Sequence, residues 1–375
     1  MLAPAARIAA VTRVLLVHQP IDGGVARHLG DLAAGLAQAG HEVVLCGPAL
    51  PSGAPASLRR ERCELGRAID PRADARALAQ LVAIVRRVRP ALVHAHSSKA
   101  GALARLARLA TPRTPLLYTP HGYAFYGHFD SSRQRLAYRE IERALAPLAS
   151  RVLCVCEAEG RLARTVGPSA RVRVVHNGIE PQGEGPVDER MAQLARTGPV
   201  LCALTLLRPG KGLETLIDAM PAVRARHPRA QLAIWGEGPE LPALRARAAS
   251  RGVGEAVHFL GHTQDPAAVL RGAEIFVHPS WAESFPYVIL EAMSARAPIV
   301  ASEVGGIAEA LVDGVSGVLV PSADAGALAQ ALAGLLEDRA RRTRLGHSAR
   351  ARVEQMFTRE RMIAGVLGVY DEALS

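Results

Sequence analysis

Two glutamates, Glu283 and Glu291, are the residues whose type and spacing best suit chemistry. An apolar run at 274–277 predicts a buried strand, and Pro286 stands where the first turn of the next helix should begin. Glu291 then lies roughly 7–8 Å deeper along the helix axis than Glu283 at the helix mouth. Free N–H groups at such a mouth attract anions. The spacing suits a sugar, a diphosphate and a ribose in line, and equally two surface glutamates near a helix start.

The residues around this pair favour a ligand site over two ordinary surface glutamates. Glu283 and Glu291 match an E-x7-E pattern, and the flanking sequences are His278-Pro279-Ser280, Glu291-Ala292-Met293 and, further on, Val304-Gly305-Gly306-Ile307-Ala308-Glu309. With these motifs, the chain from about residue 14 to its end resembles the retaining glycosyltransferases of the family-four type, also described as glycosyl transferases group 1. The resemblance implies the GT-B fold of two facing Rossmann-like domains with parallel sheets.

Strand-like and helix-like segments alternate along the whole chain, which independently predicts α/β domains with parallel sheets. In the first half, strands are expected at 13–18, 43–46, 92–96, 116–119, 152–156 and 172–176, with helices at 25–39, 76–88 and 131–148. In the second half, strands are expected at 200–207, 233–235 and 258–261, with helices at 213–226 and 327–356. Ligands of such sheets bind at the carboxyl ends of the strands.

Domain boundaries follow from composition. We expect an N-terminal acceptor-binding domain at 1–180 and a linker rich in proline and glycine at 181–198. A C-terminal nucleotide-sugar-binding domain follows at 199–357. The resemblance implies that the last segment, 358–375, is a helix that returns to the first domain. Residues 1–17 are broken by Arg7 and Arg13 and are expected to be a short extension that runs into the first strand.

In the first domain, the Gly23-Gly24 turn follows a strand, and its N–H groups could face a phosphate or sugar. The resemblance implies that Gly23, Gly24, His121 and Tyr123 bind the acceptor, that Gly24 also meets the donor, and that His121 approaches the reacting centre. A plain polar loop histidine is the alternative for His121. Cys156 stands where the family commonly has serine.

In the second domain, Lys211 lies at a helix mouth and matches the phosphate-binding lysine of the family. Leu206 occupies the position of a family arginine, and Arg208 could supply the second cation instead. The resemblance places Glu283 on the sugar as a catalytic residue and Glu291 on the ribose. The other residues expected to bind the donor are Gly236, His262, Ser284, Phe285 and Pro286.

No metal or other cofactor is expected. The sequence contains no D-x-D motif and no ligand cluster with recognisable spacing. Because side chains alternate along a strand, we expect the imidazoles of His94 and His96 to point to opposite faces, which would keep them from binding one ion. The charge of a leaving diphosphate would then be met by Lys211, arginine and helix mouths.

Composition excludes several classes of protein. Hydrophobic residues make up 49% of the 375, which excludes a disordered chain, and no apolar run reaches the ~18–20 residues of a membrane span. Only 4% are aromatic, which disfavours a nucleic-acid stacking platform. The five cysteines form no CxxC pair and predict buried thiols of a reducing cytoplasm.

Positive charge is concentrated in the first half of the chain. Residues 1–180 hold 25 Lys and Arg against 13 Asp and Glu, a net of +12, whereas residues 181–375 hold 20 against 22. Two segments could form a basic face, 99–108 with Lys99, Arg105 and Arg108, and 131–143 with Arg133, Arg135, Arg139 and Arg143. An anionic membrane surface would suit such a face, as would plain solvent or a soluble anionic acceptor.

The motifs and the resemblance together predict a GT-B enzyme that moves a hexosyl or N-acetylhexosaminyl group from a nucleotide diphosphate sugar to a glycan or lipid-linked acceptor. Retention of anomeric configuration is implied by the resemblance alone. Bacterial surface glycan or glycolipid assembly in the cytoplasm, peripheral on the inner face of the membrane, is the expected setting. A nucleotide-sugar epimerase or hydrolase of the same architecture is the alternative. A dinucleotide-dependent oxidoreductase is disfavoured because the glycine fingerprint is incomplete.

Overall fold

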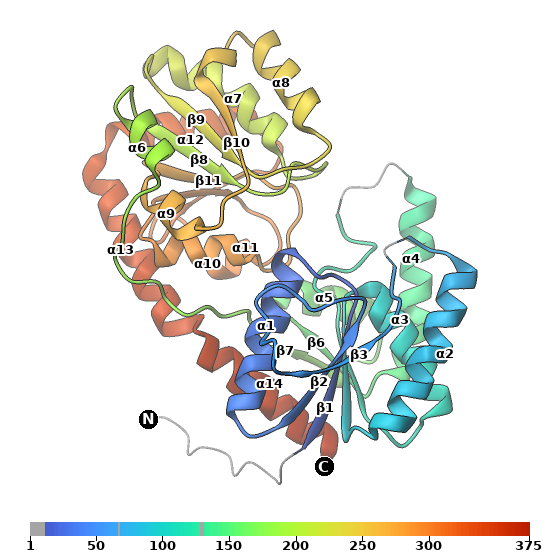
Figure 1. The fold of residues 1–375 in the computed structure, drawn as a ribbon. Helices are drawn as coiled ribbons and strands as arrows, with labels where there is room; N and C mark the ends of the chain where they lie inside the picture. Colours follow the sequence, from blue (N-terminus) through green and yellow to red (C-terminus); the bar gives the residue numbers. More distant parts are fainter. Residues whose placement is uncertain (1–11, 67, 128–130) are drawn as a thin grey trace. The chain divides into compact units, whose positions relative to one another are not determined.

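The computed structural model describes residues 12–66, 68–127 and 131–375 (Figure 1). The chain divides into two compact units, Met1–Asn177 with Arg359–Ser375, and Gly178–Thr358. The extension expected at the N-terminus lies mostly outside the described residues. The C-terminal helix belongs to the first unit, as expected. No helix among the described residues is both long and apolar enough to cross a bilayer.

The first unit is built on a seven-stranded parallel sheet with the order β3-β2-β1-β4-β5-β6-β7. The order reverses between β1 and β4, which lie side by side. The strands are β1 (Arg13–His18), β2 (Glu42–Gly47), β3 (Arg59–Arg62), β4 (Leu92–His96), β5 (Leu116–Thr119), β6 (Arg151–Cys154) and β7 (Val172–Val174).

Successive residues of these strands point to opposite faces of the sheet and belong to two different hydrophobic cores. Leu15 and Val17 of β1 pack with α2 (Pro71–Val88) and α3 (Ser98–Ala107) on one face. Val14 and Leu16 pack with α1 (Gly23–Gln38) and α14 (Arg359–Leu374) on the other (Figure 1). Near-continuous apolar strands are what a sheet covered on both faces requires. The remaining helices of the unit are α4 (Ser132–Leu145) and α5 (Glu157–Val166).

The second unit has a six-stranded parallel sheet with the order β10-β9-β8-β11-β12-β13, which reverses between β8 and β11. Its strands are β8 (Val200–Leu204), β9 (Gln231–Trp235), β10 (Val257–Gly261), β11 (Ile275–His278), β12 (Ile299–Ser302) and β13 (Val318–Val320). Its helices are α6 (Glu189–Ala195), α7 (Leu213–Arg226), α8 (Leu241–Ser250), α9 (Pro266–Arg271), α10 (Tyr287–Ser294), α11 (Ile307–Ala310), α12 (Ala325–Glu337) and α13 (Arg339–Met356).

Three features differ from the sequence expectation. The expected linker contains α6, capped by Asp188, whose carboxylate accepts from the N–H of Arg190 at 2.9 Å. The expected helix at 327–356 is two helices, because Asp338 leaves helical geometry and caps α13. Strand β3 was missed since it is a charged edge strand without an apolar pattern.

Arg105 was expected on a basic surface, and that prediction is wrong. Its side chain is 1% exposed, and its Nη1 donates to Glu142 Oε2 at 2.8 Å. The Tyr118 hydroxyl donates to the other oxygen of Glu142 at 3.0 Å, and the guanidinium lies 4.1 Å from the centre of the Tyr118 ring. A buried charge must be paired, and the helical spacing of Arg105 and Arg108 does not reveal that Glu142 is the partner.

Buried histidines gather at the carboxyl edge of the first sheet. His94 and His96 were expected on opposite faces of β4, which is wrong, because residues two apart share a face. Their ring centres are 4.0 Å apart. His94 bonds Tyr370 and Thr119, each at 2.8 Å, and His28 bonds Asn177 at 3.1 Å.

Burial favours the neutral form of these rings. It lowers the pKa of His18 and of His28 to about 4, partly offset by the hydrogen bond that each ring makes. Burial and the neighbouring histidines hold the pKa values of His94 and His96 well below the usual range. The cluster is therefore uncharged at neutral pH.

We predict that the first unit loses stability as the pH falls from about 6.5 towards 4. In that window the unfolded histidines, with a pKa near 6.5, bind protons that the folded ones do not, so the free energy of unfolding decreases. The shifts of His18 and His28 correspond to at most about 3 kcal/mol each. Thermal unfolding between pH 7.5 and 5 measures the slope. His18→Asn should make it shallower, whereas His347→Asn, at an exposed histidine of the second unit, should not. Equal slopes in both variants would contradict this account.

Candidate functional site

The second unit brings its chemically active residues together where its strand order reverses. The loop after β8 carries Arg208 and Lys211, and the loop after β11 carries Glu283. Because β8 and β11 are neighbours and parallel, both loops leave the same edge of the sheet side by side. Such a reversal is where open α/β sheets bind ligands.

Lys211, Glu283 and His278 form one polar cluster at this point. Lys211 Nζ lies 2.6 Å from Glu283 Oε1, and His278 Nε2 lies 3.1 Å from the same oxygen. Ser280 Oγ is 3.3 Å from His278 Nε2. The side chain of Glu283 is 12% exposed and that of His278 3%. The cluster can therefore orient a hydroxyl and meet negative charge with little competition from water.

Glu283 is held ionised. Burial acts to raise the pKa of its carboxyl, but the nearby Lys211 ammonium and the hydrogen bond from His278 outweigh burial and hold the pKa well below its usual range. An ionised carboxylate accepts hydrogen bonds and donates none. Glu283 is thus equipped to accept from a sugar hydroxyl.

Two glycines permit the loops to approach this closely. Gly305 has a φ of 52°, and a Cβ there would lie 1.7 Å from the carbonyl oxygen of Glu283. Gly212 has a φ of 68°, and a Cβ there would lie 1.9 Å from the carbonyl oxygen of Pro279. Any side chain at either position would displace the backbone that carries Glu283.

The remaining residues expected to bind the donor lie in the same unit. Arg208 is exposed, and among the described residues its side chain forms no ion pair that would occupy it. His262 is also exposed, and Gly236 N donates to Gly261 O at 2.7 Å beside it. These three lie at the carboxyl ends of β8, β9 and β10, where a nucleotide could reach them.

Around α10, Pro286 is the N-cap and Glu291 is the fifth residue of the helix, close to the expected placement. Ser284 accepts a hydrogen bond from Gly306 N through its carbonyl at 2.6 Å. The Phe285 ring is 3% exposed and lies 5.2 Å from the ring of Phe357. Only the backbone of Phe285 can therefore face a ligand.

In the first unit, the expected residues Gly23, Gly24 and His121 also lie at the carboxyl edge. Gly23 and Gly24 open α1 and are exposed, two residues earlier than the expected helix start. His121 has a φ of 55°, and its Nε2 lies 3.1 Å from His96 Nδ1. Burial and the neighbouring histidines hold the pKa of His121 well below the usual range.

Glu159 fixes the turn that carries His121, which the sequence did not indicate. Its carboxylate accepts from Gly122 N at 2.5 Å and from Val155 N at 2.8 Å. Cys156, in the position of the family serine, still caps α5 by accepting from Glu159 N at 3.3 Å. Glu159 is thus the residue of this segment that holds the backbone turn next to His121.

A cavity of about 600 Å³ opens beside His121. Its polar wall includes Ser97, Lys99, Gln134 and Tyr138, and its apolar wall includes residues of α1, α3, α4 and the loop after β5. Tyr123, expected at the acceptor, does not line it. The structure places Tyr123 in the core, 3% exposed and stacked 4.8 Å from the Phe125 ring, because the loop after β5 turns its aromatic side chains inward.

Three histidines could hold a metal ion. One ligand atom from each of His28, His96 and His121 lies within 4.8 Å of the others. They come from α1, from β4 and from the loop after β5, so no sequence spacing could reveal them. The contact of His278 with Glu283 was likewise not indicated by the motif, because a five-residue separation across a loop does not fix which way the two side chains point.

Comparison with known proteins identifies the family to which the chain is similar. Residues 22–182 match the family described as Glycosyltransferase Family 4, and residues 198–338 match Glycosyl transferases group 1. A glycogen synthase of Mycobacterium tuberculosis is 29% identical over 93% of this chain and 91% of its own length. A phosphatidyl-myo-inositol mannosyltransferase of Mycolicibacterium smegmatis is 30% identical over 88% and 85%.

Solved structures agree on the fold. Sucrose-phosphate synthase from Thermosynechococcus elongatus has a TM-score of 0.82 and 25% identity, covering 96% of this chain and 98% of its own. HepE of Anabaena, solved with UDP and glucose, has a TM-score of 0.81 and 21% identity, covering 96% and 100%. The GT-B fold expected from the sequence is confirmed. With its two parallel sheets and both family matches, the chain belongs to the glycosyltransferases of group 1, family 4.

Proposed function

We propose that this glycosyltransferase moves a hexose from a nucleoside diphosphate sugar to an acceptor with retention of anomeric configuration. The observation that carries the proposal is the Lys211–Glu283–His278 cluster at the strand-order reversal of the second unit. It combines a fixed cation for phosphate oxygens with an ionised carboxylate for sugar hydroxyls. A hexose is favoured over an N-acetylhexosamine because a relative is named for mannose transfer.

In this mechanism the second unit binds the donor. Glu291 binds the ribose, Lys211 and Arg208 bind the diphosphate, and Glu283 binds the sugar. As the bond from the anomeric carbon to the diphosphate breaks, negative charge grows on the leaving oxygens, and Lys211 stabilises that charge electrostatically. HepE, a structural neighbour, was solved with UDP-glucose, which supports a nucleotide sugar as the donor.

The first unit binds the acceptor. The Gly23-Gly24 turn offers backbone N–H groups, and the cavity beside His121 offers hydroxyl and amide groups together with the ion pair of Lys99 and Asp74. A neutral His121 can accept a hydrogen bond from the attacking hydroxyl or from the transferred sugar. We place the activity in the assembly of a surface glycan or glycolipid, which the phosphatidyl-myo-inositol mannosyltransferase relative supports.

Incubation with radiolabelled nucleotide sugars, with and without a membrane extract, tests the proposal. We expect label to move into an acceptor fraction only when extract is present, because transfer needs an acceptor hydroxyl. Release or isomerisation of the sugar at the same rate without extract would instead indicate a hydrolase or epimerase of this fold.

Variants of the two glutamates refine the same experiment. Loss of a charge-assisted hydrogen bond costs about 1.5–3 kcal/mol, roughly 10- to 150-fold. Glu291→Gln should weaken binding of the nucleoside diphosphate by that factor in calorimetry, whereas Glu283→Gln should lower turnover and leave nucleotide affinity nearly unchanged. Glu255→Gln, at an exposed position of the same unit, is the matched control. Unchanged nucleotide affinity in Glu291→Gln would show that the ribose assignment is wrong.

We also predict that transfer persists in excess EDTA. Lys211 and Arg208 can meet the diphosphate charge without a metal bridge, and the sequence has no D-x-D motif. Rates before and after chelation, with metal content measured on the same samples, check this. Activity that disappears with the metal and returns with Mn²⁺ or Mg²⁺ would contradict it. Loss that follows removal of an ion bound at the three histidines would contradict it as well.

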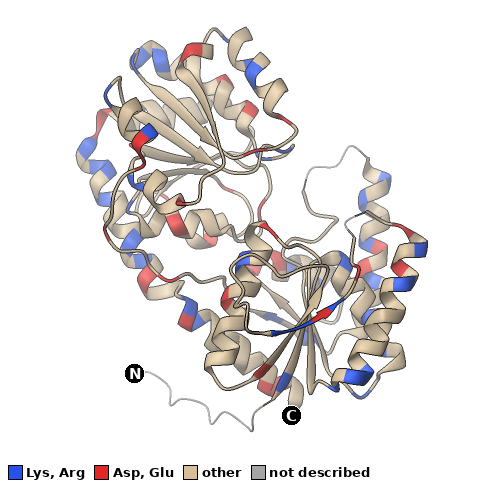
Figure 2. Cartoon of the chain, viewed as in Figure 1, with Lys and Arg blue, Asp and Glu red and all other residues tan. Residues whose placement is uncertain are grey.

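The membrane hypothesis now rests on α4 alone. Since Arg105 is buried, Lys99 pairs with Asp74 at 2.6 Å and Arg108 donates to the carbonyl of Leu148, the exposed arginines of α4 are the part of the two expected basic segments that remains as a stripe. Figure 2 shows basic residues along this helix. Arg135, Arg139 and Arg143 are four residues apart and share a helix face, and of the three Arg143 also pairs with Glu140 at 3.0 Å. Leu136 nearby is 58% exposed. We propose that α4 contacts an anionic membrane surface, where each basic residue contributes about 1 kcal/mol.

Vesicle co-sedimentation tests this contact. We expect binding to phosphatidylglycerol vesicles but not to phosphatidylcholine vesicles, with most of it lost by about 0.5 M salt because of screening. Arg135→Glu with Arg139→Glu should weaken binding. Arg341→Glu with Arg344→Glu, an equal charge change on exposed residues of α13, should not. Equal recovery in the supernatant with both lipids would exclude docking and point to a soluble acceptor.

A further inference from the structure

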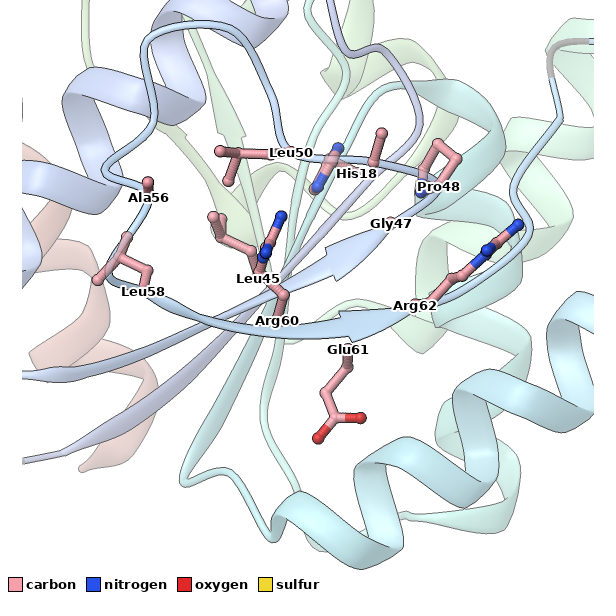
Figure 3. Close-up of a pocket in the computed structure, with 11 residues that line it drawn as sticks. His18, Leu45, Gly47, Pro48, Leu50, Ala56, Leu58, Arg60, Glu61 and Arg62 are labelled. Atoms are coloured by element: carbon pink, nitrogen blue, oxygen red, sulfur yellow. The ribbon is translucent and has the colours of Figure 1, made fainter.

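A second cavity of the first unit has no role in the mechanism above. It has a volume of about 520 Å³ and lies at the carboxyl ends of β1, β2 and β3 (Figure 3). Its apolar wall is formed by Leu45, Leu50, Ala56 and Leu58. None of its lining residues lines the cavity beside His121.

One residue that lines this cavity, His18, carries a buried nitrogen without a hydrogen-bond partner among the described residues. His18 is fully buried, and its Nδ1 donates to the carbonyl of Pro20 at 3.3 Å, since a carbonyl oxygen can only accept. The neutral ring must then keep a lone pair on Nε2, and among the described residues Nε2 has no hydrogen-bond partner. A Cβ on Gly47 would lie 2.6 Å from that nitrogen, so Nε2 packs against Gly47, which also lines the cavity. A buried acceptor without a donor is costly unless a ligand hydroxyl supplies one.

Strand β3 adds cations to the same cavity. Because side chains alternate along a strand, Arg60 and Arg62 point to the cavity side, while Glu61 points away from it (Figure 3). Glu61 is occupied by Arg59 at 2.9 Å and Arg87 at 2.5 Å on the other side. Arg60 forms no ion pair within the described part of the chain, and Arg62 has only an exposed contact with Glu64 at 3.8 Å.

We propose that this cavity binds an anionic sugar residue of the acceptor. His18 Nε2 accepts from a ring hydroxyl, Arg60 and Arg62 bind a phosphate or carboxylate substituent, and Leu50 and Leu58 cover an apolar face of the ring. A simple anion would use the arginines alone, and a neutral sugar would leave them unpaired. The combination of a lone pair, two guanidiniums and an apolar wall fits a saccharide that carries a negative charge. The inference rests on the proposed function only in assigning this sugar to the acceptor.

Calorimetry on the full chain with three matched probes tests the proposal. Glucose 6-phosphate, glucuronate and glucose share a ring and differ in carrying a phosphate, a carboxylate or no charge. We expect at least one anionic probe to bind tenfold or more tightly than glucose, and the better of the two identifies the anion. Equal affinity for all three would overturn the proposal. So would inorganic phosphate alone binding as tightly as glucose 6-phosphate, since the ring would then contribute nothing.

Matched variants locate the binding. Arg60→Ala should weaken the preferred anionic probe by about tenfold, the effect of losing one charge-assisted hydrogen bond. Arg59→Ala removes the same charge from the other face of β3 and should change probe affinity little. His18→Asn keeps a donor for Pro20 but removes the Nε2 lone pair, and should weaken the probe about fivefold. His18→Gln, which restores a polar group near Nε2, should recover part of that loss. Identical affinities in Arg60→Ala and Arg59→Ala would overturn the proposal, even if the His18 variants fail to fold.

Nucleotide binding on the same samples separates this inference from the proposed function. If a nucleoside diphosphate binds and labelled sugar is transferred, but no anionic probe binds, the cavity assignment fails and the enzyme assignment stands. If an anionic probe binds through Arg60 while no nucleotide sugar is used, the proposed function fails instead.

Discussion

The order of the strands in each sheet is the constraint on which the rest of the molecule depends. In both units the chain first adds strands on one side of the first strand and then adds the remaining strands on its other side. The two strands that meet at this reversal are therefore followed by connections that run toward opposite ends of the sheet. The space left between these loops is lined by backbone N–H groups and by whatever side chains follow the strands. Lys211 and Glu283 meet in the second unit for this reason, and Gly23 and His96 lie near the equivalent point of the first.

The contact between Lys211 and Glu283 sets a condition on any anionic ligand. A partly buried carboxylate is costly unless it is paired, and here one ammonium and one imidazole compensate it. A diphosphate that engages Lys211 must therefore leave Glu283 with another donor. The hydroxyls of a sugar attached to that diphosphate are suitable donors, and His278 remains bonded to the same oxygen. The pair of Lys211 and Glu283 thus favours a ligand that carries phosphate and hydroxyl groups together over a ligand that carries only one of these groups.

Sequence reasoning succeeded where a pattern is local. Strands β1, β4 and β5 and helix α7 have the expected bounds. Their bounds could be predicted because consecutive residues carry the signals, namely apolar runs for buried strands and glycine or proline at the ends of elements. It missed what depends on distant partners. From the sequence, Arg105 is predicted at the surface, because its partner Glu142 lies in another helix. Strand β3 was missed because it has no apolar pattern. For the site, the motif residues could be named, but the contact of His278 with Glu283 and the gathering of three histidines required coordinates.

Pairing decides which of the first unit's many arginines remain available to a ligand. Arg105 is taken by Glu142 in the core, and Arg59 and Arg87 share Glu61 on one face of the sheet edge. Each carboxylate that forms an ion pair within the unit occupies one or two basic side chains that could otherwise bind a ligand. The net charge of the unit therefore does not show where a binding face lies. Among the described residues, Arg60 on the other face of β3 and Arg135 and Arg139 on α4 form no ion pair, whereas Arg143 of α4 pairs with Glu140 at 3.0 Å. One of these places borders a cavity with an unpaired histidine nitrogen and the other lies on an exposed helix, so a small anionic group suits the first and an extended anionic surface suits the second.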